Sequence, residues 1–326
     1  MKIGKLDNQE LRRLVLDRLP ATGQFVTSGP AVGVDCSAIR FCDGQVILST
    51  DPITGASAEI GRLAVIVACN DIAACGIRPS ALLLTIIAPP RATADEIRTV
   101  IDQAAAAASK INVSIVGGHT EVSDAVTRFV VSSTAIGFTY GNHIIQATGA
   151  RAGDALIMSK TAGLEGTAIL AADQAKKLIG RMSEEELQAA RALMSQISVV
   201  EEGSCGGDMS VHAMHDATEG GILGACWELA EASGLGCVIE AAKIPIHPLT
   251  EKICRLLAID PLRLVASGSM IIAAANPDEL IAALQAKGIV GTVIGKMTEN
   301  LAKIADFGHE TMDLLPPGPD ELYKIT

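Results

Sequence analysis

The stretch AVIVACNDIAACG, residues 64–76, places two polar side chains inside an apolar run. Its small and branched residues are typical of a buried helix, which we predict over residues 60–75 with Gly76 at its end. Asn70 and Asp71 lie in the middle of that helix. A buried carboxylate is costly without a partner, so Asp71 caps a neighbouring helix, pairs with Arg78, or binds a ligand together with the Asn70 oxygen.

The segments on either side of this helix alternate between strand and helix patterns. The run VILSTD ends a predicted strand at Asp51, and Thr93 with Glu96 predicts a capping box before an amphipathic helix. Further strands are predicted in SALLLTIIA (80–88), in VSIVGGHTEV (113–122), which runs into a Gly-Gly turn, and in RFVVSSTAIGF (128–138).

The length of the chain predicts two domains. At 326 residues and 33.7 kDa it exceeds the usual size of one hydrophobic core. The small polar stretch ATGARAGD, residues 147–154, separates two strand-like runs, so we predict domains at residues 1–150 and 151–326. The second domain again alternates helix and strand. The last residues, LLPPGPDELYKIT, have the composition of a loosely held tail.

Composition and charge argue against several classes of protein. Hydrophobic residues make up 49% of the chain but aromatic residues only 2%, which predicts cores of Ala, Val, Ile and Leu as in α/β enzymes. The net charge of -11 argues against a nucleic-acid partner. No apolar run predicts a membrane span, and the polar N-terminus has no signal-peptide pattern. Eight cysteines without a C-x-x-C pair are typical of the reducing cytoplasm.

Four stretches place acids or a glycine pair at strand ends or in apolar surroundings: PAVGVDCSAI, LSTDPITG, CNDIAACG and VGGHTEV. Carboxylates that converge from different elements, with glycines that admit close backbone approach, are what a Mg-nucleotide site requires. Each stretch alone also fits a turn or a strand end, and neither a Walker nor a Rossmann glycine motif occurs. The candidates are Gly33, Asp35, Asp51, Asn70, Asp71, Gly117, Gly118, His119, Thr120 and Glu121.

A second candidate region is MHDATEGGILGA, residues 214–225, where Gly220 and Gly221 open a predicted helix. A helix N-terminus with two glycines offers free N–H groups to an anion. His215 and Asp216 precede it, and Asp216 can orient an amide, act as a base, or simply cap the helix. A zinc hydrolase is an alternative that would use His212 and His215, with Cys205 and Asp208 upstream.

In this order, the stretches resemble the superfamily of aminoimidazole-ribonucleotide synthetase, thiamine-phosphate kinase, selenophosphate synthetase and the hydrogenase maturation protein HypE. The family pattern G-x-G-[DE]-D-A-A is echoed by Gly33, Asp35 and Ser37, with Val34 in the place of one acid. STDPITG, NDIAACGIRP, VGGHTEV and HDATEGGILGACWELAEASG match the next blocks, so the similarity spans nearly the whole chain. HDATEGG and IDPLRLVASGSMIIA resemble HypE-like members most.

The resemblance implies an α+β protein of two PurM-like domains, in which the N-terminal α/β domain forms a dimer sheet or barrel and the C-terminal α/β domain has a mixed sheet. It implies ATP and Mg²⁺ as cofactors and places Asp216, with His215, at the acceptor end. His119 stands where several relatives carry an acid, and Glu121 or Asp124 could compensate. The implied metal ligands are Asp35, Asp51, Asp71 and Glu121. The implied cofactor-binding residues are Gly33, Asp35, Asp51, Asn70, Asp71, Gly117, Gly118, His119, Thr120, Gly220 and Gly221.

One departure from the HypE pattern changes the prediction for the acceptor. HypE proteins end in a Pro-Arg-Ile-Cys tail whose cysteine carries the carbamoyl group to be dehydrated to a nitrile. This chain ends DELYKIT, and its last cysteine is Cys254. We therefore predict an ATP- and Mg-dependent HypE-like enzyme, a cytoplasmic homodimer, that either acts on a separate substrate or partner or has a changed chemistry. The alternative is a nucleotide-binding accessory protein of a maturation complex.

Overall fold

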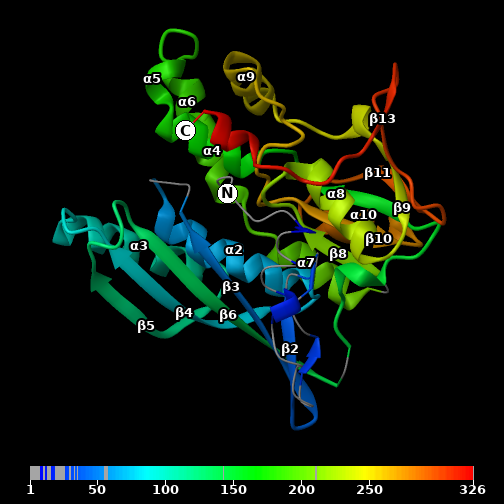
Figure 1. Cartoon of the computed structure of the whole chain (residues 1–326), viewed down its shortest axis with the longest axis horizontal. Coiled ribbons are helices and arrows are strands. Elements are labelled where there is room, and N and C mark those ends of the chain that lie inside the picture. The colour runs from blue at the N-terminus through cyan, green and yellow to red at the C-terminus, as the bar shows by residue number, and fades with distance from the viewer. Residues whose placement is uncertain are drawn as a thin grey trace.

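The computed structural model describes most of the chain as two sheets with helices packed on them (Figure 1). The expected site residues Gly33 and Asp35 lie outside the described residues. The described residues are 8–9, 12, 16–18, 26–28, 31–32, 34, 36–54, 58–141, 143–209 and 211–325.

The first sheet has six strands in the order β1-β2-β3-β6-β4-β5. All neighbouring strands are antiparallel except β4 and β5, which run parallel. The strands are β1 (Val26–Ser28), β2 (Ser37–Phe41), β3 (Gly44–Ile53), β4 (Pro79–Ala88), β5 (Ser114–Val122) and β6 (Val130–Tyr140).

Helices α2 (Ile60–Ala74) and α3 (Ala94–Lys110) cover one face of this sheet. On β4, Leu82, Leu84 and Ile86 are buried while Leu83 is exposed, because alternate residues of a strand point to opposite faces. α2 is buried almost throughout, as the sequence predicts, since it lies between the first sheet and the second half of the chain. The outer face exposes apolar side chains of β2, β4 and β6, including Phe41, Leu83, Phe138 and Tyr140.

The turn expected at Gly117 and Gly118 does not occur, because both glycines lie within β5. Gly118 has a φ of 150°, and a Cβ at this position would collide with the Leu84 carbonyl of the neighbouring strand. The glycine therefore allows two parallel strands to approach closely, instead of reversing the chain.

The second sheet has seven strands in the order β13-β12-β9-β11-β7-β10-β8. Its neighbours are antiparallel except β12 and β9. The strands are β7 (Ala155–Ser159), β8 (Ala213–Asp216), β9 (Gly236–Glu240), β10 (Met270–Ala274), β11 (Gly291–Thr298), β12 (Lys303–Asp306) and β13 (Thr311–Asp313). Mixed sheets in both halves, with helices between the strands, confirm the predicted α+β fold class.

Helices cover both faces of the second sheet. α8 packs on one face, while α7, α10 and the last turn of α2 pack on the other, so that β7, β8 and β10 are almost wholly buried. The predicted capping box is present at Thr93 with Glu96, and a second one lies at Ser183 with Glu186. The remaining helices are α4 (Leu164–Asp173), α5 (Ala175–Leu178), α6 (Glu184–Ala192), α7 (Val200–Asp208), α8 (Gly221–Ala232), α9 (Pro248–Leu257) and α10 (Pro277–Ala286).

The C-terminal segment, which we define as residues 314–325, is docked on the second half, and the expectation of a loosely held tail is wrong. It runs from β13 back toward α4 and α6 and ends in a short 3-10 helix, η5 (Glu321–Lys324) (Figure 1). Leu314 and Leu322 are buried in the apolar cores, and Asp320 is 1% exposed. Within the described ranges, no helix combines the length and apolar character that a membrane span needs.

Candidate functional site

Asp71 faces the first sheet. Its carboxylate accepts a hydrogen bond from the Ser49 hydroxyl on β3, and both side chains are buried. The burial follows from the position of Asp71 on α2, on the side that packs against β3 and β6. The strand hydroxyl is a partner that the sequence analysis did not name for Asp71.

Asp51 lies on the same face of the sheet as Ser49, two residues farther along β3. It pairs across the sheet with Ser133, whose hydroxyl donates to the Ala64 carbonyl of α2. Ser49 and Asp51 are about 7 Å apart along the strand and both face α2, so Asp51 lies next to the pair formed by Ser49 and Asp71.

Asp51 and Asp71 by themselves offer few ligands to a metal ion. In the part of the chain that the structure describes, no three His, Cys, Asp or Glu side chains are grouped closely enough to hold a metal. Mg²⁺ usually takes one or two carboxylates together with substrate phosphates, so Asp51 and Asp71 fit that ion when a nucleotide supplies the other oxygens.

Asn70 points away from Asp71, toward the second half of the chain. Its amide nitrogen donates to the Ile197 carbonyl at 2.8 Å, and its amide oxygen accepts from the Val199 N–H at 2.9 Å. Both polar ends of this fully buried side chain are thus bonded to the segment between η3 (Leu193–Gln196) and α7. The adjacent residues Asn70 and Asp71 connect α2 to the two halves of the protein.

The residues expected from VGGHTEV lie on the exposed edge strand β5. His119 is in register with Thr85 and Glu121 with Ile87, so both lie on the outer face of the sheet, whereas Thr120 and Gly118 are in register with residues of the inner face. His119 Nε2 lies 3.3 Å from Glu121 Oε2, and both side chains are at least half exposed. The structure therefore does not bring Glu121 together with Asp51 and Asp71.

His215 and Asp216, the expected catalytic pair, point to opposite faces of β8. His215 Nε2 lies 3.1 Å from Glu228 Oε2 of α8, and the ring is buried. Asp216 is 1% exposed and shares the face of Met214, which packs in one apolar cluster with the last turn of α2. Asp216 is thus the member of the pair that faces the first half.

The histidines of the zinc alternative have separate carboxylate partners. His212 Nδ1 lies 2.8 Å from Asp154 Oδ1, whereas His215 contacts Glu228. Because His212 and His215 are three residues apart on an extended chain, their side chains point to opposite faces. The structure gives this alternative no support.

The predicted anion site at the start of α8 is occupied by the chain itself. The Gly220 N–H donates to Asp320 Oδ2 of the C-terminal segment at 2.8 Å, and Pro317 packs against Gly220. Burial raises the pKa of Asp320 to about 6. It also raises the pKa of the nearby Glu165, on the first turn of α4, to about 7. An anion that binds the Gly220 amide must therefore displace an internal carboxylate.

A cleft of about 440 Å³ lies at the other end of α2, between that helix, α4 and α6. Arg62 and Arg191 line it together with small apolar residues, and both guanidinium groups are already ion-paired, to Glu59 and Glu184. From Arg62 to Asp71 the helix rises about 13 Å. The cleft is therefore a separate feature from the two carboxylates.

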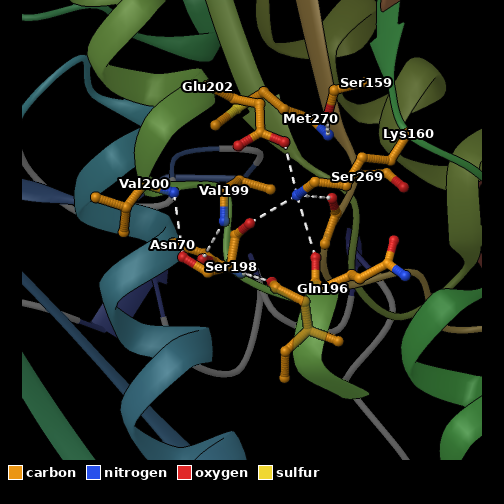
Figure 2. Close-up of polar contacts among 12 residues, drawn as sticks. Asn70, Ser159, Lys160, Gln196, Ser198, Val199, Val200, Glu202, Ser269 and Met270 are labelled. Carbon is orange, nitrogen blue, oxygen red and sulfur yellow. Dashed lines mark hydrogen bonds and ion pairs between the residues drawn. The ribbon is translucent and has the colours of Figure 1, made fainter. Parts of the chain in front are cut away.

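Sequence reasoning missed a buried ammonium at the junction of the two halves. Lys160 follows β7 with a φ of 56°, and its Nζ lies 2.6 Å from Glu202 Oε1 (Figure 2). The same Nζ donates to the carbonyls of Gln196 and Ser198. The sequence does not show that this lysine has a positive φ. Besides Glu202, its partners are backbone carbonyls, which every residue carries, so no residue type marks them.

Comparisons with known proteins agree with this architecture. The model of the AIR synthase related protein N-terminal domain matches residues 33–139, and the model of the C-terminal domain matches residues 151–305. A putative hydrogenase expression/formation protein of Methanocaldococcus jannaschii is 29% identical over 282 residues, which cover 84% of this chain and 81% of that protein. Carbamoyl dehydratase HypE of Cupriavidus necator is 28% identical over 282 residues, 83% of this chain and 76% of that protein.

A solved structure of the hydrogenase maturation protein HypE in complex with ATP has a TM-score of 0.69 to this chain, at 20% identity. The superposition covers 98% of this chain and 97% of that one. The matches confirm the resemblance that the motifs indicate, and with it the two-part PurM-like fold.

Proposed function

Because this chain belongs to the AIR synthase related protein family, we propose that it is an ATP- and Mg²⁺-dependent HypE-like enzyme that acts in hydrogenase maturation. It phosphorylates an amide- or acid-type oxygen. The observation that carries the proposal is the similarity to a carbamoyl dehydratase over 83% of the chain. A carbamoyl group presents an amide oxygen, which is the kind of acceptor that phosphorylation would activate for dehydration.

The carboxylates of the first half have the role of holding the metal and, through it, the phosphates. Asp51 and Asp71 would bind Mg²⁺, which when bound neutralises charge on the transferring phosphoryl group. The Ser49 hydroxyl keeps the Asp71 carboxylate turned toward β3, where Asp51 lies. Gly33, Asp35, Gly117, Gly118 and Thr120 keep the roles predicted from the sequence as part of this proposal, and Gly220 and Gly221 take theirs when the nucleotide displaces Asp320. Asn70 is bonded at both polar ends, and His119 and Glu121 lie on the outer face of the sheet, so these three residues are left out of the proposed site.

The acceptor group belongs to a separate molecule. Seven of the eight cysteines are buried, Cys42 being the exposed one. Burial raises the pKa of the Cys254 thiol to about 12 and that of Cys69 to about 12, so these thiols are poor nucleophiles. Asp216, on the face of β8 that looks toward α2, would orient the incoming amide or take its proton. His215 points to the opposite face and would contribute only by holding β8 against α8 through Glu228.

The proposal includes a homodimer formed through the first half. The exposed apolar side chains of β2, β4 and β6 form one open face of a sheet, and such a face is typically covered in an assembly. We propose residues 1–150 as the dimerising, nucleotide-binding domain and residues 151–326 as the second domain. None of the eight cysteines forms a disulfide, which favours a reducing compartment, and we propose the cytoplasm.

The test replaces each carboxylate without changing its size. Asp51→Asn and Asp71→Asn should each lower ATP-dependent phosphate release with a carbamoylated peptide by at least about 100-fold, since each removes a charge from the proposed metal site. Asp313→Asn, on the exposed strand β13, is the matched control and should retain full activity. Folded variants at positions 51 and 71 that bind and hydrolyse ATP like the parent would overturn the assignment.

The second candidate is a nucleotide-binding accessory protein without turnover. The internal carboxylate on the Gly220 amide favours it, because the predicted anion site of the second half is already filled. Tight binding of Mg-ATP with no phosphate release in the presence of carbamoylated partners would support this candidate. Turnover with any such partner would exclude it.

A further inference from the structure

The junction between the two halves is built around one ammonium group, on Lys160. This side chain is 17% exposed, and its carboxylate partner Glu202 on α7 is 1% exposed. Lys160 Nζ also donates to the Gly268 carbonyl at 2.9 Å and to the Ser198 carbonyl at 2.7 Å. Burying an ion pair is expensive, so a pair with this many additional hydrogen bonds indicates a place whose geometry is tightly specified.

One end of this network leads to Asp71. Lys160 holds the carbonyls of Gln196 and Ser198, while Asn70 holds Ile197 and Val199 of the same segment from the opposite side (Figure 2). The segment is therefore fixed between the ammonium and α2. Since Asn70 immediately precedes Asp71 on α2, a shift of the segment would change where Asp71 lies relative to the second half, while Asp71 keeps its bond to Ser49.

The other end leads to Asp216. Lys160 Nζ donates to the carbonyl of Gly268, which lies two residues before Met270. Met270 is the partner of Asp216 in the pairing of β10 with β8. The Met270 N–H in turn donates to the Ser159 hydroxyl, next to Lys160 in the chain. A Cβ at Gly268 would lie 2.8 Å from Ile197 Cα. The backbone at Gly268 and the backbone at Ile197, which Lys160 and Asn70 support, are therefore in direct contact.

From this arrangement we propose that Lys160 is a positioning residue that sets Asp71 relative to Asp216. The inference rests on the proposed function, in which Asp71 is on the nucleotide side and Asp216 on the acceptor side. Lys160 touches neither reactant. Its ammonium fixes the two backbone supports at one point, which keeps the phosphoryl donor and its acceptor at a reactive distance.

The inference predicts a split between catalysis and nucleotide binding. Lys160→Met keeps the length of the side chain and removes the charge, so kcat for phosphate release should fall at least about 10-fold. The Kd for the magnesium complex of a non-hydrolysable ATP analogue should stay within about 3-fold, because the carboxylates of the first half keep their own contacts. The Val199 N–H, bonded to Asn70, should exchange with solvent at least about 10-fold faster.

Two further variants keep the test decisive. Lys160→Met leaves Glu202 buried without its partner and can unfold the protein, so the double variant Lys160→Met with Glu202→Gln removes both charges. Lys287→Met is the matched control, because Lys287 pairs with the exposed Glu201, one residue before Glu202. The control should match the parent in kcat, in Kd and in exchange of Val199.

The outcomes separate this inference from the proposed function. A parent protein that neither binds the analogue nor releases phosphate overturns the proposed function, and the positioning role with it. An active parent together with a folded double variant of unchanged kcat, or of unchanged Val199 exchange, overturns the positioning role alone. Loss of kcat with retained Kd and faster exchange supports it.

Discussion

Two glycine pairs, Gly117–Gly118 and Gly220–Gly221, have similar surroundings in the sequence and very different ones in the structure. The first pair lies inside β5, an edge strand whose nine residues are all exposed. The second pair opens α8 and lies beneath the C-terminal segment, where Gly220, Gly221 and the neighbouring helix residues Ile222 and Leu223 are buried. Both pairs predict close approach of some group to the backbone. What approaches differs between them.

In the first pair the approaching group is another strand, and in the second it is the chain's own end. Gly118 faces the Leu84 carbonyl, whereas the Gly220 N–H is bonded to Asp320. A glycine pair therefore reports that a side chain would not fit, and it carries no information on whether backbone, ligand or carboxylate occupies the space. Four experiments test this difference, beginning with the one that should change stability most.

Gly118→Ala should be the most damaging change. The new Cβ collides with the Leu84 backbone at a φ of 150°, which L side chains rarely adopt, so the free energy of unfolding should fall by about 3 kcal/mol or more. Urea unfolding of the purified protein measures this. A variant as stable as the parent would show that β5 does not need the close approach to β4.

The sequence predicts those parts of the fold that depend on neighbouring residues, and it fails where segments far apart in the chain decide the structure. The burial of Asp71, the capping boxes at Thr93 and Ser183, and the strand that ends near Asp51 follow from neighbours within a few residues. Such signals are local propensities and periodicities, and the structure confirms them. The Gly-Gly turn and the loose tail were wrong because a distant strand and a distant helix decided them.

The candidate site, too, could be predicted only where its contacts are local in the sequence. The sequence indicates that Asp71 needs a partner, but Ser49 lies 22 residues away and has no special pattern. Lys160 bonds to carbonyls 36 and 108 residues away, and a backbone carbonyl looks the same at every position of a sequence. The family resemblance supplied the superfamily and the order of the acids. It could not supply the internal carboxylate at Gly220, since Asp320 follows a proline-rich stretch that predicts a turn.

The pH dependence should distinguish the second glycine pair from the first. Burial raises the pKa of Glu165 to about 7 and that of Asp320 to about 6, so the folded state binds more protons than the unfolded state between about pH 4.5 and 7. Stability from these groups is present at low pH and is lost as the pH rises through 6 and 7. We expect a loss of about 2 kcal/mol between pH 5 and pH 8.

Urea unfolding at both pH values measures this loss. Glu165→Gln should remove much of it, whereas Glu299→Gln, an exposed acid in a turn, should leave the profile unchanged. A profile that is the same in Glu165→Gln and the parent would mean that Glu165 is ionised in the folded protein at neutral pH. The contrast between an exposed pair and a buried, proton-dependent pair would then lose its basis.

Asp320→Ala should release the C-terminal segment from the second pair. It removes the bonds from the Gly220 and Leu322 N–H groups and leaves both of these buried donors unsatisfied, so unfolding should be easier by about 2 kcal/mol. The segment should become sensitive to limited proteolysis, which mass spectrometry of the fragments detects. Asp313→Ala, on exposed β13, is the control and should resist cleavage as the parent does.

Gly117→Ala should have the smallest effect on stability and is the sharpest probe of the first pair. Its Cβ would meet only the flexible end of Leu83, at 3.3 Å, and its φ is not in the left-handed region, so unfolding should change by no more than about 0.5 kcal/mol. Gly118→Ala beside it differs by one position and should be severe. If the nucleotide contacts the backbone of β5 as proposed, Gly117→Ala also weakens the binding of Mg-ATP, measured by calorimetry, while the protein stays folded. Unchanged binding would leave both glycines with structural roles, and the pair would then resemble Gly220–Gly221 in being filled by the protein itself.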